Sequence, residues 1–517
     1  MKFPKIRSVK FRLVVIASLL VASALIALVV GLVLRRQYIK KPAVEGYSQA
    51  AISTDAAQCA PVGKSILKKN GSVVDAAIAT LLCMGVVIPQ SMGLGGGFLM
   101  LIYRRNEKAA YVLNAREVAP QAATENMFQG VSELSQTGGL SIGVPGELAG
   151  YAAAWTKYGK LRWSELFQPA IHICEKGFLV GRHLANALYL NKDIIENDNS
   201  LRGLQTQSHD NLTFYGVPPP GSGALLSYMI NTLDEYGFNE TSFSTNNKKV
   251  QNYHRMIEAF KYAYAKRTEL EDPGVDASSS QYERISKLVQ ELASKEFAKE
   301  TKNNIYDNQT FDPSHYGVEP FIQADWGTSH LSIVAPNGDA VAVSSTINSY
   351  FGSKKASIST GIVFNNEMDD FSSPNITNAY GIVPSKYNKI SPGKRPFSSM
   401  SPTIVVDGNG NIRLVIGGTG GTKITTATTL VSILNLRAGL SIKNAIDSPR
   451  IHHQLIPNTI MYEPNFPEEL LEGLKRKGHN VTEISGRSSF IMGIARKKSG
   501  TLYANADYRK GGASDGF

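Results

Sequence analysis

The spacing of apolar residues divides the chain into a helical part and a later part rich in strands. Between Asp55 and about Glu300, apolar side chains recur at three- and four-residue intervals, which is typical of helices with one buried face. We predict the clearest helices at residues 74–87 and 252–266, and another near residues 224–236. This part of the chain is therefore expected to be mainly helical.

After Gly327 the apolar residues occur in short runs, several of which alternate with polar residues, as in strands with one buried face. The polar residues 295–321 lie between the two parts and are predicted to form an exposed loop, and a helix is predicted near residues 425–435. The predicted strands are residues 98–104 and 109–114, which form a hairpin within the helical part, and residues 328–335, 340–346, 361–364, 403–407, 412–417 and 491–495.

One long uncharged stretch, residues 13–34, precedes both parts. As a helix, its 22 residues would span roughly 33 Å, which is enough to cross the hydrocarbon core of a membrane. The stretch is long for the apolar region of a cleavable signal peptide, and no small-residue cleavage site precedes Arg35. We therefore expect a transmembrane signal anchor, with residues 1–12 as a tail and residues 35–54 as a stalk.

The distribution of glycosylation sequons predicts the orientation of this anchor. Basic residues flank the apolar stretch on both sides, so the positive-inside rule decides little. Asn-X-Ser/Thr sequons occur only after the apolar stretch, at Asn70, Asn211, Asn239, Asn308, Asn375 and Asn480. We expect a single-pass type II protein of the plasma membrane, with a cytoplasmic tail and a glycosylated extracellular body.

The net charge of +11 does not by itself indicate a nucleic-acid-binding protein. Nine basic residues and no acidic residue lie within residues 1–41, so nine of the eleven net charges belong to this segment. A nucleic-acid-binding surface would need a basic excess on the folded body. We therefore do not expect a nucleic acid as a partner. With 517 residues and 43% hydrophobic content, the chain can bury a large core.

The three cysteines are too few for a disulfide-rich scaffold and offer no zinc-binding spacing. Cys59 and Cys83 could pair outside the cell, but Cys83 is equally consistent with a small apolar position in a buried helix. Cys174 is predicted to be a buried thiol. The sequence thus leaves the pairing of Cys59 and Cys83 open.

A hairpin is predicted at residues 328–346, and its loop sets its register. Pro336-Asn337-Gly338 suits a three-residue loop, because proline fixes the first turn position and glycine accepts the left-handed one. Thr328 then lies opposite Thr346, with Asn348 just beyond. A two-residue loop would turn Thr346 to the other face of the sheet. We prefer the first register because it uses the proline.

Thr328 follows a glycine, in Asp325-Trp326-Gly327-Thr328-Ser329-His330. If the peptide bond between Gly327 and Thr328 breaks, Thr328 acquires an α-amine with a pKa near 7.7–8.0, which can act as the base for its own hydroxyl. A threonine at the start of a strand is also common without any function. The assignment therefore depends on the residues around it.

Four other segments offer groups that would suit a small zwitterionic substrate. Arg116 follows a strand and can bind a carboxylate with its two-pronged guanidinium, although an arginine with this context alone is far more often a surface residue. Ser398-Ser399 offers hydroxyls for the same anion, or forms a polar loop. The acids of residues 365–370 could hold an ammonium, or form a solvated turn. The loop Gly417–Lys423 lacks the Walker and dinucleotide spacings, so we interpret its N–H groups as an oxyanion hole.

Together these segments closely resemble the γ-glutamyltransferases, and the resemblance extends from Asp55 to Phe517. So many matches in the same order make chance similarity implausible. The matching segments are Gly93-Leu-Gly-Gly-Gly-Phe98, Leu113-Asn-Ala-Arg-Glu-Val-Ala-Pro120, Val144-Pro-Gly-Glu147, Asp325–His330, Ser345-Thr-Ile-Asn348, Phe351-Gly-Ser353, Phe364–Ser373, Pro396–Met400, Gly417–Thr426 and the terminal Arg509-Lys-Gly-Gly512.

The resemblance implies an α+β fold, the four-layer αββα sandwich of the N-terminal-nucleophile hydrolases, formed by two subunits cut from one precursor. The Thr328 hydroxyl would attack the carbonyl of Gly327, and water would open the resulting ester. Cleavage would leave a heterodimer of a large subunit, residues 55–327, and a small catalytic subunit, residues 328–517.

The resemblance also implies γ-glutamyl transfer or hydrolysis without a metal or any other cofactor. Thr328 would take the glutamyl group from glutathione, a glutathione conjugate or another γ-glutamyl compound, and pass it to water, an amino acid or a dipeptide. By correspondence, Thr346 orients the nucleophile and the N–H groups of Gly420 and Gly421 hold the oxyanion. The α-carboxylate is assigned to Arg116, Ser398 and Ser399, and the α-ammonium to Asn348, Glu367 and Asp370.

Two further points come from the same resemblance. It implies a disulfide between Cys59 and Cys83, as in animal relatives, whereas a second cysteine pair of some vertebrate members has no counterpart here. Two rival functions were a self-cleaving acylase of the cephalosporin-acylase branch and a catalytically silent surface glycoprotein. The residues suited to an amino-acid head group argue against the first, and the complete set of expected catalytic positions argues against the second.

Overall fold

The computed structural model describes residues 46–181, 183–184, 212–274, 276, 278–317, 327–374, 376, 385–484 and 488–517, and all of them belong to one compact unit, Gly46–Phe517. The expected anchor at residues 13–34 lies outside the described residues, as do the sequons at Asn211 and Asn375. Within the described ranges, no helix has both the length and the apolar character that a membrane crossing requires.

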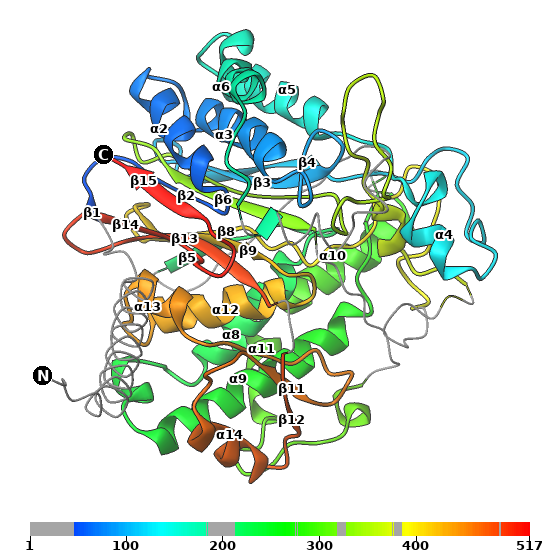
Figure 1. The fold of residues 1–517 in the computed structure, drawn as a ribbon. Coiled ribbons are helices and arrows are strands. Elements are labelled where there is room, and N and C mark those ends of the chain that lie inside the picture. The colour runs from blue at the N-terminus through cyan, green and yellow to red at the C-terminus, as the bar shows by residue number, and fades with distance from the viewer. Residues whose placement is uncertain are drawn as a thin grey trace, which may run out of the picture. The chain divides into compact units, whose positions relative to one another are not determined.

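Two six-stranded sheets stack face to face (Figure 1). The first sheet has the strand order β15-β2-β6-β7-β3-β4 and the second has the order β1-β14-β13-β9-β8-β5. Their facing side chains form one core, for example Leu101 and Val334 with Val415 and Ile494. The strands are β1 (Gly46–Tyr47), β2 (Ala51–Thr54), β3 (Gly97–Arg104), β4 (Ala109–Ala115), β5 (Leu212–Tyr215), β6 (Thr328–Val334), β7 (Ala340–Thr346), β8 (Thr403–Asp407), β9 (Ile412–Thr419), β13 (Phe490–Arg496), β14 (Leu502–Ala506) and β15 (Ala513–Gly516).

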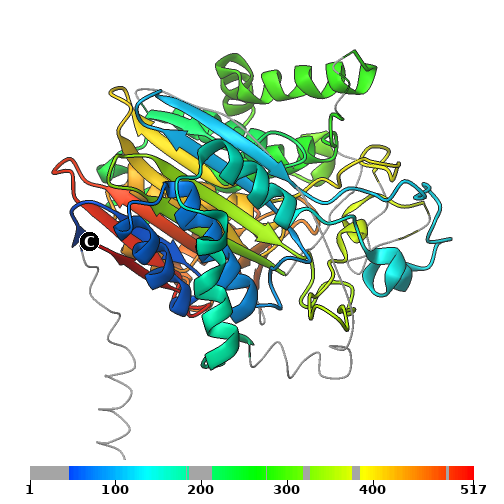
Figure 2. The same cartoon turned by 90° about the horizontal axis from the view of Figure 1, so that it is seen from above.

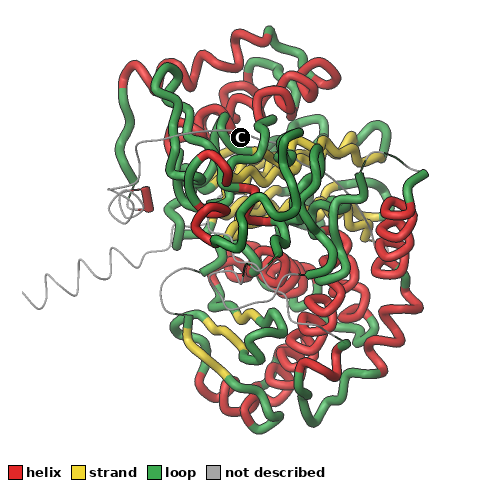
Figure 3. The backbone as a smooth tube through the Cα atoms, turned by 90° about the vertical axis from the view of Figure 1, so that its right-hand side faces the viewer, coloured by secondary structure: helices red, strands yellow, loops and turns green. Residues whose placement is uncertain are grey.

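Helices cover the outer face of each sheet. Figure 2 shows from above the helices that lie over the strands, and Figure 3 shows from the side the strands between the two helical layers. The first sheet packs against α2 (Ala60–Lys68), α3 (Val73–Val87), α5 (Glu147–Tyr158) and α6 (Trp163–Lys176). The second packs against α8 (Gly223–Asp234), α9 (Asn246–Arg267), α10 (Ser280–Ala293), α12 (Lys423–Leu436), α13 (Ile442–Asp447) and α14 (Glu468–Lys475). This arrangement is the expected four-layer αββα sandwich. The remaining elements are α4 (Ser132–Gln136), α11 (Lys295–Asn303), whose Phe297 stacks on Tyr228 of α8, and a small sheet of β10 (Ile451–His452), β11 (Ile460–Tyr462) and β12 (Val481–Glu483).

Both sheets combine strands from before and after Gly327. In the first sheet, β2 lies between β15 and β6, and β7 pairs with β3. In the second sheet, β1 and β5 form the two edges, and every strand between them follows Gly327 in the chain. A break after Gly327 would therefore leave the two pieces joined by backbone hydrogen bonds and by a shared core.

Three predictions of secondary structure were wrong. Residues 51–54 were expected in a stalk but form the inner strand β2, whose four residues are all buried and are too few to show a period. Residues 361–364 form no strand, and only Val363 makes an isolated bridge, to Ala356. Residues 295–303 form α11 rather than a loop, because Ser294 caps the helix by accepting a hydrogen bond from the N–H of Phe297 at 3.0 Å.

Cys174 was predicted to be a buried thiol, but it is exposed and free near the end of α6. The helix buries Leu166 and Ala170 on its inner face. Cys174 follows Ala170 by four residues, yet it lies in the last turn, beyond the region where the helix is covered. The helical period alone therefore predicted the wrong environment.

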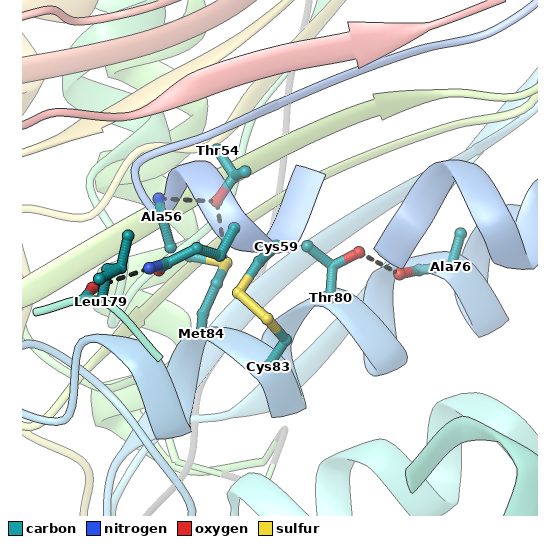
Figure 4. Close-up of a disulfide and its surroundings, with 9 residues drawn as sticks. Thr54, Ala56, Cys59, Ala76, Thr80, Cys83, Met84 and Leu179 are labelled. Carbon is teal, nitrogen blue, oxygen red and sulfur yellow. Dashed lines mark hydrogen bonds between the residues drawn. A yellow bond between two sulfur atoms is a disulfide. The ribbon is translucent and has the colours of Figure 1, made fainter. Parts of the chain in front are cut away.

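A disulfide joins Cys59 to Cys83 and links the start of α2 to α3 (Figure 4). The two Cα atoms are 5.7 Å apart, and both residues are buried. The pairing implied by the family resemblance is thus confirmed. The bridge fixes two of the helices that cover the first sheet, next to β2 and β6.

We predict that the double variant Cys59→Ala/Cys83→Ala unfolds at a lower temperature than the natural chain. The two cysteines are 24 residues apart. Opening a loop of this length gives the unfolded chain more conformational entropy, which lowers the free energy of unfolding by about 3 kcal/mol at 25 °C. The midpoint of thermal unfolding without reductant measures the effect. Cys174→Ala is the matched control and should leave the midpoint unchanged. Equal midpoints for the double variant and the natural chain would contradict a stabilising bridge.

Candidate active site

Thr328 is the first residue of β6, and Thr346, the last residue of β7, lies directly opposite it. The N–H of Ala335 donates to the carbonyl of Asp339 at 2.9 Å, so the hairpin has a three-residue loop. The predicted register is confirmed and the two-residue alternative is wrong. Thr328 is completely buried, at the end of an inner strand.

The hydroxyls of Thr328 and Thr346 lie 3.1 Å apart. Thr346 donates its hydrogen to the carbonyl oxygen of Gly327 at 2.9 Å and accepts from the N–H of Asn348 at 2.9 Å. Because Thr346 uses its one hydroxyl hydrogen on Gly327, the hydrogen between the two threonines belongs to Thr328. The geometry therefore aligns the Thr328 hydroxyl through Thr346.

The carbonyl oxygen of Gly327 accepts a second hydrogen bond, from the N–H of Ile347 at 3.2 Å. The N–H of Gly327 donates to the carbonyl of Asn348. A side chain at position 327 would place its Cβ atom 2.3 Å from the carbonyl oxygen of Ser349, so only glycine fits. Two donors on this carbonyl can stabilise a negative charge that develops on its oxygen.

Lys510 and Asp55 lie beside the nucleophile, and neither was predicted from the sequence as a site residue. The ammonium of Lys510 donates to the carbonyl oxygen of Thr328 at 2.6 Å and pairs with Asp55 at 2.6 Å. Burial raises the pKa of Asp55, and Lys510 opposes this shift. In the sequence, Lys510 belongs to the segment Arg509-Lys-Gly-Gly512, which resembles the family's terminus. That resemblance did not assign a role to the lysine.

A buried cluster of charges surrounds Arg116. Its guanidinium donates to Asp370 at 2.6 Å, to Glu367, and to Glu117 at 3.4 Å, and its Nε donates to the carbonyl of Pro396 at 3.2 Å. The structure thus brings together three predicted site residues, Arg116, Glu367 and Asp370. They pair with one another, whereas the sequence analysis assigned them to opposite ends of a substrate.

The cluster holds one arginine against three carboxylates, and their ionisation is coupled. Burial raises the pKa of Glu117 to about 7 and also raises that of Asp370, although Arg116 opposes both shifts. Burial alone would lower the pKa of Arg116, but Glu367, Glu117 and Asp370 together raise it. The site therefore keeps a permanent cation beside an excess of carboxylates, which favours an added ammonium group.

Ser398 and Ser399 follow Pro396 closely and are buried. The hydroxyl of Ser399 accepts a hydrogen bond from Arg267 at 3.0 Å, and that of Ser398 accepts from the N–H of Met400 at 3.3 Å. Arg267, the last residue of α9, also lowers the pKa of Asp370, although less than Arg116 does. Sequence reasoning missed Arg267 because nothing near it distinguishes it from other helix-terminal basic residues.

Asn348 adds a neutral polar group on the Thr328 side of the site. It has a left-handed backbone with φ 66°, and its side-chain amide donates to the carbonyl of Asn366 at 3.0 Å. Within the described part of the chain, its buried Oδ1 accepts no hydrogen bond. A buried acceptor of this kind can receive a hydrogen bond from a substrate.

The glycine-rich loop after β9 lies across from the start of β6. A Cβ atom at Gly417 would lie 2.3 Å from the ring of His330, which follows Thr328 by two residues on the same face of β6. Gly420 and Gly421 come next, with φ angles of 122° and 60° that favour glycine. They lie immediately before α12, where backbone N–H groups can point at an anion.

Glu147, the first residue of α5, is buried beside the hairpin. Both of its carboxylate oxygens lie 2.9 Å from the hydroxyl of Ser345, and the hydroxyl of Tyr151 also donates to it. Burial raises the pKa of Glu147 to about 8, and the hydrogen bonds from Tyr151 and Ser345 oppose this shift. Burial therefore favours the protonated form of Glu147 in the folded protein.

This raised pKa predicts how stability changes with pH. The folded chain binds the Glu147 proton more tightly than the unfolded chain does. The stabilisation of the folded state by this proton is therefore complete below pH 4.5 and is lost as pH rises towards 8. Glu147→Gln should remove this loss, so its thermal midpoint relative to the natural chain should rise between pH 5 and pH 8. Glu175→Gln, on the surface of α6, is the control. Parallel pH profiles for Glu147→Gln and the natural chain would contradict a buried neutral carboxyl.

Comparisons with known proteins agree with this geometry. A family model described as Gamma-glutamyltranspeptidase matches residues 59–212 and 202–517. The chain is 43% identical to "Scoloptoxin SSD14" of Scolopendra dehaani, over 91% of this chain and 92% of that protein. It is 35% identical to "Glutathione hydrolase proenzyme 1" of Schizosaccharomyces pombe, over 90% of this chain and 84% of that protein.

The fold also matches a solved structure. A cephalosporin acylase from Bacillus halodurans superposes with a TM-score of 0.76 at 21% identity, covering 92% of this chain and 97% of that one. At this identity the likeness concerns the N-terminal-nucleophile hydrolase fold alone. The family model and the relatives cover both the charge cluster around Arg116 and the hairpin that carries Thr328. The chain therefore belongs to the gamma-glutamyltranspeptidase family.

Proposed function

We propose that this protein cleaves the γ-glutamyl amide bond of glutathione and its conjugates, and passes the glutamyl group to water, an amino acid or a dipeptide. The observation that carries the proposal is the buried cluster of Arg116 with Glu367 and Asp370. An α-amino acid head group can enter such a cluster by exchanging its own carboxylate and ammonium for the existing ion pairs. An acyl group without an α-carboxylate and an α-ammonium could not form ion pairs with the cluster.

The proposed maturation begins at the hydrogen-bonded pair of Thr328 and Thr346. The Thr328 oxygen attacks the carbonyl carbon of Gly327, and Thr346 and the N–H of Ile347 support the developing charge on the carbonyl oxygen. The C–N bond breaks as the nitrogen takes up the proton that the Thr328 hydroxyl loses, which leaves an ester on Thr328. Water then hydrolyses the ester and leaves a carboxylate on Gly327 and a free α-amine on Thr328.

In the proposed turnover, the α-amine of Thr328 takes the hydroxyl proton while the oxygen attacks the γ-carbonyl of the substrate. The N–H groups of Gly420 and Gly421 hold the oxyanion. The amine product leaves with the proton from the α-ammonium, and the glutamyl group remains as an ester on Thr328. Water or an acceptor amine then attacks this ester, again with the α-amine as base, and releases glutamate or a new γ-glutamyl compound.

For substrate binding, we assign the α-carboxylate to Arg116, Ser398 and Ser399, and the α-ammonium to Glu367, Asp370 and Asn348. Arg267 supports this assignment because it donates to Ser399 and carries a second positive charge on the carboxylate side. The unsatisfied Oδ1 of Asn348 supports it on the ammonium side. The excess of carboxylates near Glu367 and Asp370 favours a positively charged substrate group at this position.

We further propose that the mature protein is a heterodimer of residues 55–327 and 328–517, anchored by residues 13–34 in the plasma membrane with its glycosylated body outside. Both sheets are built from strands of both pieces, which supports a stable heterodimer, and the disulfide suits an oxidising compartment. Removing residues 1–41 and adding a secretion signal should release active, glycosylated enzyme into the medium. Recovery of the intact chain in the cytosolic fraction would refute the anchor.

Hydrolysis of γ-glutamyl-p-nitroanilide by the purified protein tests the proposed function. We expect activity on this compound and on glutathione, and none on glutaryl-p-nitroanilide, which lacks the α-ammonium and α-carboxylate. Activity on the glutaryl compound alone would identify an acylase instead. A correctly folded protein that cleaves neither compound would identify a silent surface glycoprotein.

A further inference from the structure

Three buried residues outside the candidate active site converge as metal ligands do. His254 and Glu258 lie one turn apart on α9, and His479 follows α14. The Nδ1 atom of His254 is 2.8 Å from the Nε2 atom of His479, and potential ligand atoms of all three residues lie within 4.8 Å of one another. The two histidines are 225 positions apart in the sequence, so no spacing motif could reveal the cluster.

Neighbouring groups hold the three side chains in the arrangement that a metal requires. The Nε2 atom of His254 lies 2.8 Å from the carbonyl oxygen of Tyr306, which can only accept, so the ring hydrogen is on Nε2 and the lone pair is on Nδ1. Metal-binding histidines usually make this outer hydrogen bond to a carbonyl or carboxylate. The oxygens of Glu258 are fixed in the same way, by Thr310 and Tyr316, each at 2.6 Å.

The hydrogen bond between the two rings also suits a metal. It joins one N–H group to one lone pair, and the outer hydrogen bond of His254 places that lone pair on its Nδ1 atom. In the present pair, the Nε2 of His479 donates to the Nδ1 of His254. When that hydrogen moves to the Nδ1 of His479, both facing nitrogens offer lone pairs, and the ring stays neutral.

Two lysines lie near the cluster, and other oxygens hold both of them. Lys477 donates to Gln251 at 3.0 Å and to the carbonyl of Asp307. The ammonium of Lys261 is 3.8 Å from Glu258, but it donates to the hydroxyl of Thr310 and to the carbonyl of Phe311 at 2.6 and 2.9 Å. Because these two oxygens hold the ammonium of Lys261, the carboxylate of Glu258 keeps lone pairs that can bind a metal ion.

We propose that His254, Glu258 and His479 bind one divalent transition metal ion, with zinc the best match. Two imidazoles and one carboxylate are a frequent zinc ligand set, and the fourth position remains for water. His254 and Glu258 precede Gly327 and His479 follows it, so the ion joins α9 to the segment after α14 across the proposed subunit boundary. The site has a structural role, distinct from the metal-free chemistry at Thr328, and exists whether or not the chain is cut.

Zinc binding by the full chain tests the proposal. The protein is incubated with zinc chloride and desalted, and its zinc content is measured by mass spectrometry. We expect one zinc ion per chain, and a loss of binding in His479→Gln. His172→Gln, the same substitution at an exposed histidine of α6, should bind as the natural chain does. Tyr316→Phe, which removes the donor to Glu258, should weaken binding roughly tenfold or more.

A second measurement does not depend on the folding of any variant. Cobalt(II) added to the natural chain should give the visible absorption of a four-coordinate histidine site, and zinc should abolish it. Zinc should also raise the thermal midpoint of the natural chain but not that of His479→Gln. The proposal fails if the natural chain gives no such spectrum, or if it retains no more zinc than His479→Gln. Because neither readout requires catalysis, failure here would leave the proposed function intact.

Discussion

Thr328→Ala should remain a single uncut chain and should hydrolyse γ-glutamyl-p-nitroanilide roughly a thousandfold more slowly, or not at all. The substitution removes the only atom proposed to attack both the Gly327 carbonyl and the substrate. It also removes the partner of the Thr346 hydroxyl, 3.1 Å away. Denaturing electrophoresis shows whether the chain is cut, and N-terminal sequencing of the smaller piece from the natural protein should begin with Thr328.

The control for this experiment is Thr328→Ser, which keeps the hydroxyl. We expect it to be cut, more slowly than the natural chain, because the missing methyl group no longer restricts the side-chain rotamer. Ser329→Ala changes the next residue and should leave cleavage unaffected. If Thr328→Ala yielded two pieces, or if an intact chain were fully active, self-cleavage at Gly327 would be ruled out.

Replacing Arg116 should produce the second large effect, on both binding and stability. Arg116→Ala would leave Glu117, Glu367 and Asp370 buried without a cation, and breaking buried pairs of this kind costs about 3–5 kcal/mol. The thermal midpoint should therefore fall sharply. This variant alone could not separate a folding defect from a binding defect.

Arg116→Lys makes that separation. A lysine keeps the positive charge, but it cannot contact Glu367 and Asp370 with a rigid two-pronged group. Loss of one charge-assisted hydrogen bond to the substrate carboxylate costs about 1.5–3 kcal/mol, which is roughly a ten- to hundredfold rise in KM. Steady-state kinetics with γ-glutamyl-p-nitroanilide measures the change, and Arg162→Lys on the surface is the control. An unchanged KM would remove Arg116 from the carboxylate site.

The local pattern of apolar residues was sufficient to predict elements whose structure depends on a single segment of the chain. The helix at residues 73–87 and the hairpin of β6 and β7 have long, regular apolar patterns, and Pro336 and Gly338 set the register that placed Thr328 opposite Thr346. The short strands β2 and β15 were not predicted. Their positions depend on pairing with distant segments, with Ala51 opposite Val334 and Ala513 opposite Thr54.

The sequence by itself determined the family, the αββα sandwich, the identity of the candidate nucleophile and the residue types suited to an amino-acid head group. The tertiary structure alone decided which charges meet. Lys510 reaches Thr328 across 182 positions, Arg116 reaches Asp370 across 254, and His254 meets His479 across 225. Coulomb forces and hydrogen bonds act over a few ångströms, so partners this far apart in the sequence become identifiable only when folding brings them together and excludes water.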